Sequence, residues 1–529
     1  MSKQKVALVI LSVIFFAAYS WFGLATPNIF NSPDETANYF FISRLHINGD
    51  FFSPEPLNAF LNSSIHPRSI SYNGFSLVPQ GFIGLPLLYG FLSKVLGLFL
   101  IKFFTPLLAV LGALAFYGII GKTFNHKIAF LSMLLLLLFP AYWYYSSRYL
   151  YPNVPFLAFF LIAVWALYCG ALHKEKKIKY LFIFSVSAAL ALAIRPVESL
   201  WFIPIIIIGI VLHRKKLSIT KVAASLGIML ALAAPILVNS YILYGDPLGT
   251  GYGLMQAVDY SSAPAGIISS GAPNGQSIFL PYGFNAGAIA KNVYKILIKY
   301  FWWFSIPAAL GFFALFFCKI KKEEKFYIIG TLAVSIWLII YYGSGVFYDN
   351  PNMGRLSMGD SHFRYWLPVF ALAMPFAASF WVRLGEKIKQ EKILISSVLI
   401  FVSFLSIYAV FSGVDDGLRA VRQVLWTNYG VKMEVMKILP ENSIVITGRQ
   451  DKIFFPDIKV LYSEKLDNSL ILNIVKTQNP FYYYGVGLNA EDLVKTNNFL
   501  RIYGLKLERV RIFGKEVLYK LKKINEAAV

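Results

Sequence analysis

The feature that most constrains this chain is a series of apolar runs of roughly 17–25 residues, the length that crosses a bilayer core. These runs recur along the chain to about residue 412. Backbone polar groups in hydrocarbon must find partners within their own segment, so the runs predict transmembrane helices, whereas a membrane barrel would need short alternating strands. Only 14% of the 529 residues are charged, against roughly 25% in a soluble protein. The chain is therefore predicted to be a polytopic α-helical membrane protein.

Positive charge orients these helices. The net charge of +22 would suggest nucleic acid in a soluble chain, but lysine and arginine also mark cytoplasmic loops, and no basic face interleaved with aromatics points to nucleic acid. Basic clusters occur at Lys122–Lys127, His173–Lys179, His213–Lys221, Lys319–Lys325 and Arg383–Lys392. Placing all of them in the cytoplasm with the N-terminus predicts about eleven spans. They lie near 7–25, 98–120, 128–146, 155–172, 180–195, 199–212, 222–242, 298–318, 326–342, 365–381 and 393–412.

Two apolar segments can each be interpreted in two ways. The first span could be a signal peptide, but its apolar stretch exceeds the roughly 7–15 residues usual for one, so a retained anchor is predicted. Residues 77–93 are apolar enough to span, yet that would move several basic clusters outside, so an interfacial or re-entrant helix is predicted. Polar loops at 26–97, 146–154, 243–297 and 343–364 then share the outer face.

The chain is predicted to divide into a transmembrane catalytic domain, 1–412, and a soluble extracytoplasmic α/β domain, 413–529. Helices are predicted at Val431–Leu439 and near 468–477 and 489–500. Strands are predicted at Ser443–Thr447 and Lys459–Ser463, followed by a closing hairpin with its turn at Gly514-Lys515. This tail could help to bind an acceptor, but a role as a simple cap is favoured.

Two adjacent carboxylates, Asp34 and Glu35, lie within about ten residues of the first span's outer end. Anionic groups that close to hydrocarbon are functional candidates. A carboxylate that accepts a proton from a hydroxyl is the general base of glycosyl transfer. The structural alternative is helix capping, with Ser32 or Asp34 opening a helix through Thr36–Ile42.

Several motifs occur in the order of a known superfamily. They are NSPDETANYFF after the first span, SIHPRS (64–69), SSRYLYPNVPFLAFF (146–160), AIRPVESLW (193–201), YGDPLGTGYG (244–253) and HFRYWLPVFALAMP (362–375). Together they resemble the outer-face motifs of GT-C glycosyltransferases, the superfamily of protein O-mannosyltransferases and aminoarabinose transferases. The resemblance covers about residues 1–412 and implies a GT-C-like fold. It also implies inverting transfer of a sugar from a polyprenyl-phosphate donor to a protein, lipid or glycan acceptor.

The resemblance also implies roles for individual residues. Asp34 matches the catalytic base, and Glu35 would hold an acceptor group or a cation. Family members often carry a second acid after the third helix, but Tyr151-Pro152-Asn153 stands there in this chain. No metal or other cofactor is expected to be required, although Asp34 and Glu35 could bind Mg²⁺ or Mn²⁺ with waters.

Departure of a lipid phosphate develops negative charge, which arginine donors would stabilise. Arg364, beside Tyr365 at the start of a helix, is the first choice, and Arg195 and Arg148 are the next. Arg68 and Lys291 could contribute, His66 could donate or accept a hydrogen bond, and Tyr252 could line a sugar or lipid groove. Snorkelling to the interface is the structural alternative for each basic residue.

Two other functions fit less well. A transporter or flippase of a lipid-linked sugar should carry ionisable residues at mid-membrane depth and internal repeats, but the polar motifs here gather at one face. An O-antigen ligase-like or polymerase-like enzyme shares the chemistry but uses a diphosphate donor, which calls for more arginines.

Overall fold

The computed structural model describes residues 3–172, 177–212, 219–255, 279–317, 319–347, 356–413, 415–463 and 466–524. Parts of the predicted basic clusters at 173–179 and 213–221, and of the outer loops 243–297 and 343–364, lie outside these residues. Contacts group the chain into two compact units. The first contains Met1–Ala25, Phe99–Val238 and Ser269–Val421, and the second contains Thr26–Leu98, Asn239–Ile268 and Arg422–Val529. The predicted first outer loop and the C-terminal segment thus share one unit. The predicted division at residue 412 stays a prediction.

The first unit is a bundle of helices. They are α1 (Lys3–Ala25), α4 (Ile101–Thr123), α5 (His126–Leu138), α6 (Pro140–Ser147), α7 (Asn153–Leu172), α8 (Lys177–Ile194), η3 (Pro196–Glu198), α9 (Ser199–Leu212), α10 (Ile219–Tyr244, which runs into the second unit), α12 (Ala286–Val293), η5 (Tyr294–Tyr300), α13 (Trp302–Ala314), η6 (Leu315–Phe317), α14 (Lys322–Gly343), α15 (Ser361–Tyr365), α16 (Leu367–Lys387) and α17 (Glu391–Ser412).

The chain is a multi-pass membrane protein. Seven helices among the described residues are long and apolar enough to cross a membrane, and the number rises to ten if each of three bent pairs is one span. The predicted count of eleven is not confirmed, because α8 and the segment from Pro196 form a pair bent by 117° that can count as one broken span. Its bend falls at the Arg195-Pro196 step, where proline cannot continue the helix.

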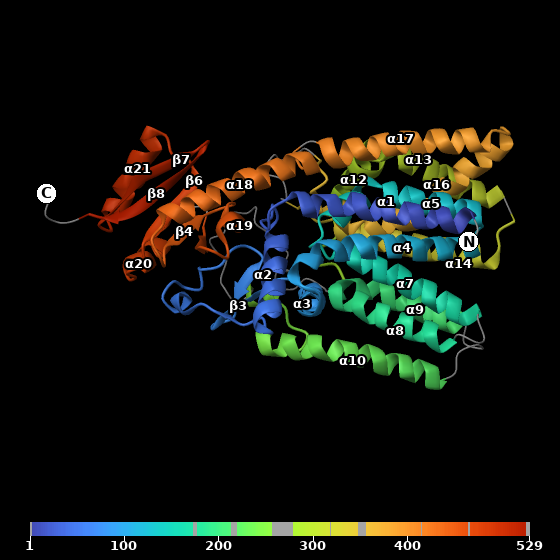
Figure 1. The fold of residues 1–529 in the computed structure, drawn as a ribbon, viewed down its shortest axis with the longest axis horizontal. Coiled ribbons are helices and arrows are strands. Elements are labelled where there is room, and N and C mark those ends of the chain that lie inside the picture. The colour runs from blue at the N-terminus through green and yellow to red at the C-terminus, as the bar shows by residue number, and fades with distance from the viewer. Residues whose placement is uncertain are drawn as a thin grey trace. The chain divides into compact units, whose positions relative to one another are not determined.

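Close helix contacts hold the bundle together. A Cβ on Gly112 of α4 would lie 2.8 Å from the Ala158 Cα of α7, so only glycine allows this approach. The buried Tyr19 hydroxyl of α1 donates to the Leu137 carbonyl of α5 (2.6 Å). Figure 1 shows the axes of α1, α4, α5, α7 and α8 roughly aligned with one another, nearly horizontal in the view. This packing makes the first predicted span a part of the bundle.

The second unit combines short helices with two sheets. Its elements are α2 (Pro33–Asn48), β1 (Ser53–Pro54), η1 (Pro56–Ala59), β2 (Ile70–Tyr72), β3 (Ser76–Pro79), α3 (Gly84–Leu96), α11 (Gly251–Met255), α18 (Leu418–Ile438, which begins in the first unit), β4 (Ile444–Thr447), α19 (Asp451–Phe454), β5 (Lys459–Tyr462), α20 (Asn468–Val475), β6 (Phe481–Val486), α21 (Ala490–Arg501), β7 (Leu505–Phe513) and β8 (Glu516–Lys523). The short 3-10 helix η2 (Leu98–Leu100) joins α3 to α4.

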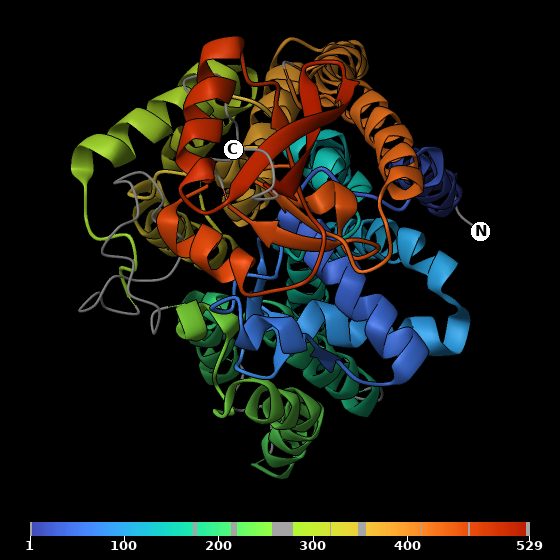
Figure 2. The same ribbon diagram turned by 90° about the vertical axis from the view of Figure 1, so that its left-hand side faces the viewer.

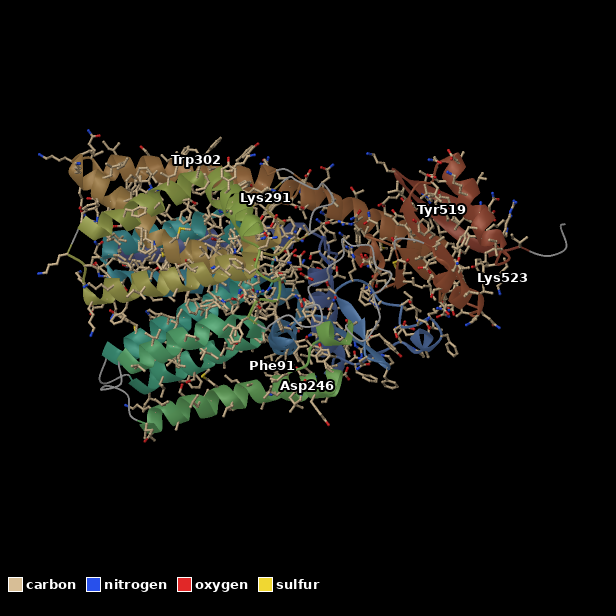
Figure 3. The ribbon with its side chains drawn as sticks, turned by 180° about the vertical axis from the view of Figure 1, so that it is seen from behind. Phe91, Asp246, Lys291, Trp302, Tyr519 and Lys523 are labelled. Atoms are coloured by element: carbon tan, nitrogen blue, oxygen red, sulfur yellow. The ribbon has the colours of Figure 1, made fainter. Side chains whose placement is uncertain are left out.

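The larger sheet has the order β5-β4-β6-β8-β7, with β5, β4 and β6 parallel and the β7–β8 hairpin antiparallel. One face packs against α20 and α21 through Ile471 and Leu500, and both helices are visible beside the strands in Figure 2. Tyr519 of β8, labelled in Figure 3, lies in this core. Leu61 and Ile65 of the first outer loop belong to the same core. Loop and tail therefore fold together.

The predicted tail elements are present, with differences. The hairpin turn falls at Gly514-Lys515 as predicted, but α18 begins at Leu418, well before the predicted Val431. The central strand β6 was missed, because FYYYG lacks the alternation that indicates a half-buried strand.

The disputed segment 77–93 holds the end of β3 and most of α3, a helix of 13 residues. A helix of this size rises about 20 Å, which is less than the roughly 30 Å thickness of the hydrocarbon core. That length agrees with an interfacial or re-entrant helix.

Candidate functional site

Three arginines predicted to bind the donor phosphate come together in the first unit. Arg148 caps the C-terminal end of α6, Arg195 precedes η3, and Arg364 lies in α15. Two tyrosines, Tyr151 and Tyr365, lie among them. We call these five residues the arginine–tyrosine cluster.

The cluster is a chain of alternating guanidinium groups and aromatic rings. The Arg148 guanidinium lies 5.2 Å from the Tyr151 ring centroid, and Arg364 lies 5.0 Å from the same ring. Tyr365 comes next, with Arg364 at 5.1 Å and Arg195 at 5.2 Å from its centroid. Each distance is within the roughly 6 Å over which a cation is attracted to an aromatic ring. The rings thus hold three permanent positive charges near one another.

Burial makes this concentration of charge significant. Arg148 is 3% exposed and Arg195 is 7% exposed, and guanidinium groups stay charged at any ordinary pH. The Arg148 Nη1 donates to the Tyr144 hydroxyl (2.8 Å), and Arg195 is ion-paired with Glu198. Bringing charges out of water is expensive unless an opposite charge compensates. Such a cluster is suited to an anion, and planar guanidinium groups match the geometry of phosphate oxygens.

Glu198 fixes the orientation of Arg195. Its Oε1 accepts from the Arg195 Nε (3.0 Å) and Nη2 (2.8 Å) and from the Tyr342 hydroxyl (2.9 Å). Its Oε2 accepts from the Trp201 indole N–H. The Tyr342 ring stacks on Tyr365 at 4.5 Å between centroids. Glu198 was not predicted, although the spacing Arg-Pro-x-Glu places an acid three residues after the arginine.

The position of Arg364 depends on its short helix. Asp360 caps α15 by accepting from the His362 backbone N–H (2.9 Å), and its Oδ1 also lies 2.9 Å from the His362 Nδ1. The Arg364 Nη2 donates to the Ser361 hydroxyl (2.9 Å). The Asn153 amide donates to the Arg364 carbonyl (3.2 Å). Asn153, which stands near the place of the family's second acid, therefore contacts the backbone of the cluster.

The predicted acidic residues lie in the second unit, at the start of α2. Ser32 is the N-cap, and its hydroxyl accepts from the Asp34 backbone N–H (3.2 Å), so the capping role belongs to Ser32. Asp34 is partly buried and its Oδ1 accepts from the Ser69 hydroxyl (2.8 Å), while Glu35 is 3% exposed. The partial positive charge of the helix N-terminus stabilises carboxylates in this first turn.

His66 and Arg68 follow Asp34 in the same unit. The His66 Nδ1 lies 3.0 Å from the Pro67 carbonyl oxygen, and burial lowers the pKa of the imidazole. The Arg68 guanidinium is ion-paired with Asp451, with 2.6 Å between Nη2 and Oδ1. This pair gives Arg68 a structural contact with the C-terminal segment. Substrate binding by His66 or Arg68 stays a prediction.

Tyr252 also belongs to the second unit, on α11. Its ring lies edge-to-face with Phe82 at 6.4 Å between centroids. The preceding Gly251 lies against the Gln80 backbone, where a Cβ would come within 2.5 Å of the Gln80 Cα. Lys291, labelled in Figure 3, is exposed on α12 in the first unit. The cations over the Tyr151 and Tyr365 rings are Arg148, Arg195 and Arg364, not Lys291.

The structure thus brings the predicted residues together in two groups. Arg148, Arg195, Arg364 and Tyr365 share the first unit, and Asp34, Glu35, His66, Arg68 and Tyr252 share the second. The meeting of Asp34 and Arg364 in one pocket stays a prediction. In the described part of the chain, no group of three or more histidine, cysteine, aspartate or glutamate side chains could hold a metal ion. Binding of Mg²⁺ or Mn²⁺ by Asp34 and Glu35 with waters stays a prediction as well.

Comparison with known proteins gives two kinds of similarity. Residues 11–257 match the sequence model of the Alg9-like mannosyltransferase family. No curated protein matches the chain.

Among solved structures, the chain is similar to ArnT from Cupriavidus metallidurans bound to undecaprenyl phosphate, with a TM-score of 0.60 and 10% identity over 98% of each chain. The apo form of that protein aligns with a TM-score of 0.52 and 11% identity, over 98% of this chain and 97% of that chain. The apo oligosaccharyltransferase of Archaeoglobus fulgidus has a TM-score of 0.50 and 9% identity, over 92% of this chain and 70% of that chain. At such identities the likeness concerns the fold.

Proposed function

We propose that this chain, a membrane glycosyltransferase of the GT-C superfamily, moves a sugar from a polyprenyl-phosphate-linked donor to an acceptor at the extracytoplasmic face. The arginine–tyrosine cluster is the observation that carries the proposal, because it concentrates three buried or partly buried guanidinium groups. A similar fold, that of ArnT, occurs with undecaprenyl phosphate bound.

The cluster suits the leaving group of this reaction. A polyprenyl-phosphate sugar is a phosphodiester with one negative charge, and the departing polyprenyl phosphate carries up to two. Guanidinium groups that are already oriented stabilise the charge that develops, without reorganisation at the moment of reaction. Glu198 and Tyr342 orient Arg195, and α15 with Asn153 orients Arg364. The cluster would therefore act more strongly on the transition state than on the bound donor.

Asp34 is the proposed base. Its carboxylate takes the proton of an acceptor hydroxyl while the hydroxyl oxygen forms a bond to the anomeric carbon. The bond between that carbon and the phosphate oxygen breaks, and its electron pair leaves with the polyprenyl phosphate. Attack opposite the leaving group inverts the anomeric configuration. Glu35 is proposed to hold the acceptor, and general-base assistance of this kind contributes roughly 10²–10⁴-fold.

The test uses membranes that contain the protein and a panel of radiolabelled polyprenyl-phosphate sugars. Asp34→Asn should lower transfer by about 10²-fold or more. Asp50→Asn is the matched control, because Asp50 follows the other end of α2, is exposed and pairs only loosely with Arg44 (3.4 Å). Its transfer rate should equal that of the unsubstituted protein.

Three results would change the assignment. Full transfer by Asp34→Asn removes this residue from the mechanism. Transfer from polyprenyl-diphosphate sugars alone indicates a ligase-like or polymerase-like enzyme. If no donor supports transfer but labelled lipid moves between leaflets of reconstituted vesicles, the protein is a flippase.

A further inference from the structure

Two consecutive residues, Arg68 and Ser69, connect the proposed base to the C-terminal segment within the second unit. The Ser69 hydroxyl donates to the Asp34 Oδ1 (2.8 Å). The neighbouring Arg68 is held by Asp451 of α19, whose carboxylate accepts from the Arg68 backbone N–H (2.7 Å) and Nη2 (2.6 Å). Asp451 is fully buried, at 0% exposed. Two adjacent residues therefore join Asp34 to the tail.

The backbone at Ser69 shows that this loop is held in place. Ser69 has a φ of 62°. This value lies in the left-handed region that residues other than glycine seldom adopt. The Ser69 carbonyl accepts from the Gln80 N–H (3.2 Å), and on its other side the Arg68 Nη2 donates to the Arg449 carbonyl (2.9 Å). These contacts hold the backbone from which the Ser69 hydroxyl reaches Asp34.

A second, independent contact ties the helix of Asp34 to the same segment. The Phe40 ring of α2 packs edge-to-face on Phe455, which directly follows α19, with 4.7 Å between centroids. Both the helix that carries Asp34 and the loop that donates to it thus rest on residues 449–455. A segment that only covered the outer face would not need to contact both.

We propose, on the basis of the function proposed above, that Ser69 and the Arg68–Asp451 pair are positioning residues, through which the C-terminal segment orients the Asp34 carboxylate toward the acceptor. Positioning acts on the chemical step. Small displacements of a reacting group can lower the rate by about 10²-fold, whereas binding of the donor by the arginine–tyrosine cluster should be unaffected.

Ser69→Gly tests the hydroxyl directly. Glycine adopts a positive φ without strain, so the variant removes the hydrogen bond and keeps the loop conformation. We expect kcat to fall about 10-fold or more, with the KM for the donor unchanged. Arg68→Lys keeps the charge but loses the planar fork that contacts Asp451, and it should show the same pattern in milder form.

Asp451→Asn tests the tail, and Glu55→Gln is its matched control. Glu55 also joins the predicted first outer loop to the C-terminal segment, through an ion pair with Lys459 (2.8 Å), but its carboxylate accepts from Lys459 and the Leu57 N–H rather than from Arg68 or Ser69. We expect kcat to fall in Asp451→Asn and to stay normal in Glu55→Gln, with melting temperatures of the purified proteins as the check on folding. Equal losses in both variants would mean that the tail only braces the loop, and would overturn the proposal.

A normal kcat in Ser69→Gly would also overturn it. The outcome of Asp34→Asn separates the two levels of inference. If Asp34→Asn is inactive while Ser69→Gly and Asp451→Asn are fully active, the base is supported and the positioning role is wrong. If Asp34→Asn is active, the proposed base itself fails.

Discussion

Binding of undecaprenyl phosphate should depend on the planar guanidinium of Arg364. Arg364→Lys keeps one positive charge but removes a group that lies 5.0 Å from the Tyr151 ring centroid and 5.1 Å from that of Tyr365. Lysine cannot form the second of the two parallel N–H···O bonds that a guanidinium makes to a phosphate, and a hydrogen bond to a charged group contributes about 1.5–3 kcal/mol. Phosphate binding should therefore weaken by roughly 2 kcal/mol, or about 30-fold in Kd.

Thermal unfolding of the detergent-solubilised protein measures this loss without knowledge of the sugar or the acceptor. At a ligand concentration of about 100 times Kd, the unsubstituted protein should gain about 2.7 kcal/mol of stability. After a roughly 30-fold weakening the same concentration is about three times Kd, and the gain falls to about 0.9 kcal/mol. The ligand-induced rise in melting temperature should thus shrink to about a third in Arg364→Lys.

Two controls make the result specific. Undecaprenol, which lacks the phosphate, should stabilise both proteins equally. Arg383→Lys makes the same exchange near the C-terminal end of α16 and should keep the full response to undecaprenyl phosphate. If Arg364→Lys responds to the phosphate as strongly as the unsubstituted protein does, Arg364 does not bind the lipid phosphate and the role proposed for the cluster is refuted.

Three further outcomes follow from the contacts. Glu198→Gln leaves the charge of Arg195 buried without its ion-pair partner and should destabilise the protein by roughly 3–5 kcal/mol, seen as a lower melting temperature. By contrast, Glu386→Gln, which breaks a pair with Lys127 in which both side chains are more than half exposed, should change it little. Gly112→Leu should separate α4 from α7 and destabilise the protein by about 1–3 kcal/mol or more. Gly330→Ala, with open space at its Cβ position, should not destabilise the protein. Equal effects of the two substitutions would contradict the close approach of α4 and α7 at Gly112. Because burial lowers the pKa of His66 in the folded state, the unfolded chain binds the proton first, so stability should fall as pH drops below the unfolded pKa of about 6.5. In His66→Gln, the fall in melting temperature between about pH 7 and 5 that is due to this histidine should disappear.

The sequence was most informative where a residue's role depends on local chemistry. Arg148 and Arg195 lie in turn motifs on the predicted outer face and Arg364 at the start of a predicted helix there, and these arginines do share one cluster. The aromatic partner Tyr151 was visible only as a departure from a family pattern. Glu198, three residues from Arg195, could have been found from its spacing, but nothing in its own segment indicates the contact with Tyr342, which is 144 residues away.

The tail shows the opposite case. Its closing hairpin was predictable, because turn residues between alternating strands act locally. Its association with the first outer loop was not, because Leu61 and Ile65 enter the core of the C-terminal sheet from nearly four hundred residues upstream. The role of Arg68 changed for the same reason: sequence suggested a substrate, and the structure places a buried aspartate beside it.

By itself, the sequence determined that the chain is a multi-pass helical membrane protein, and it identified the charged groups that are predicted to share one face. The length and apolarity of each run decide insertion segment by segment, since a helix satisfies its own backbone hydrogen bonds. Only the tertiary structure decided which of those charges meet and which are ion-paired. Ring contacts and ion pairs depend on distances of a few ångströms between segments far apart in the chain, and no local pattern encodes those distances.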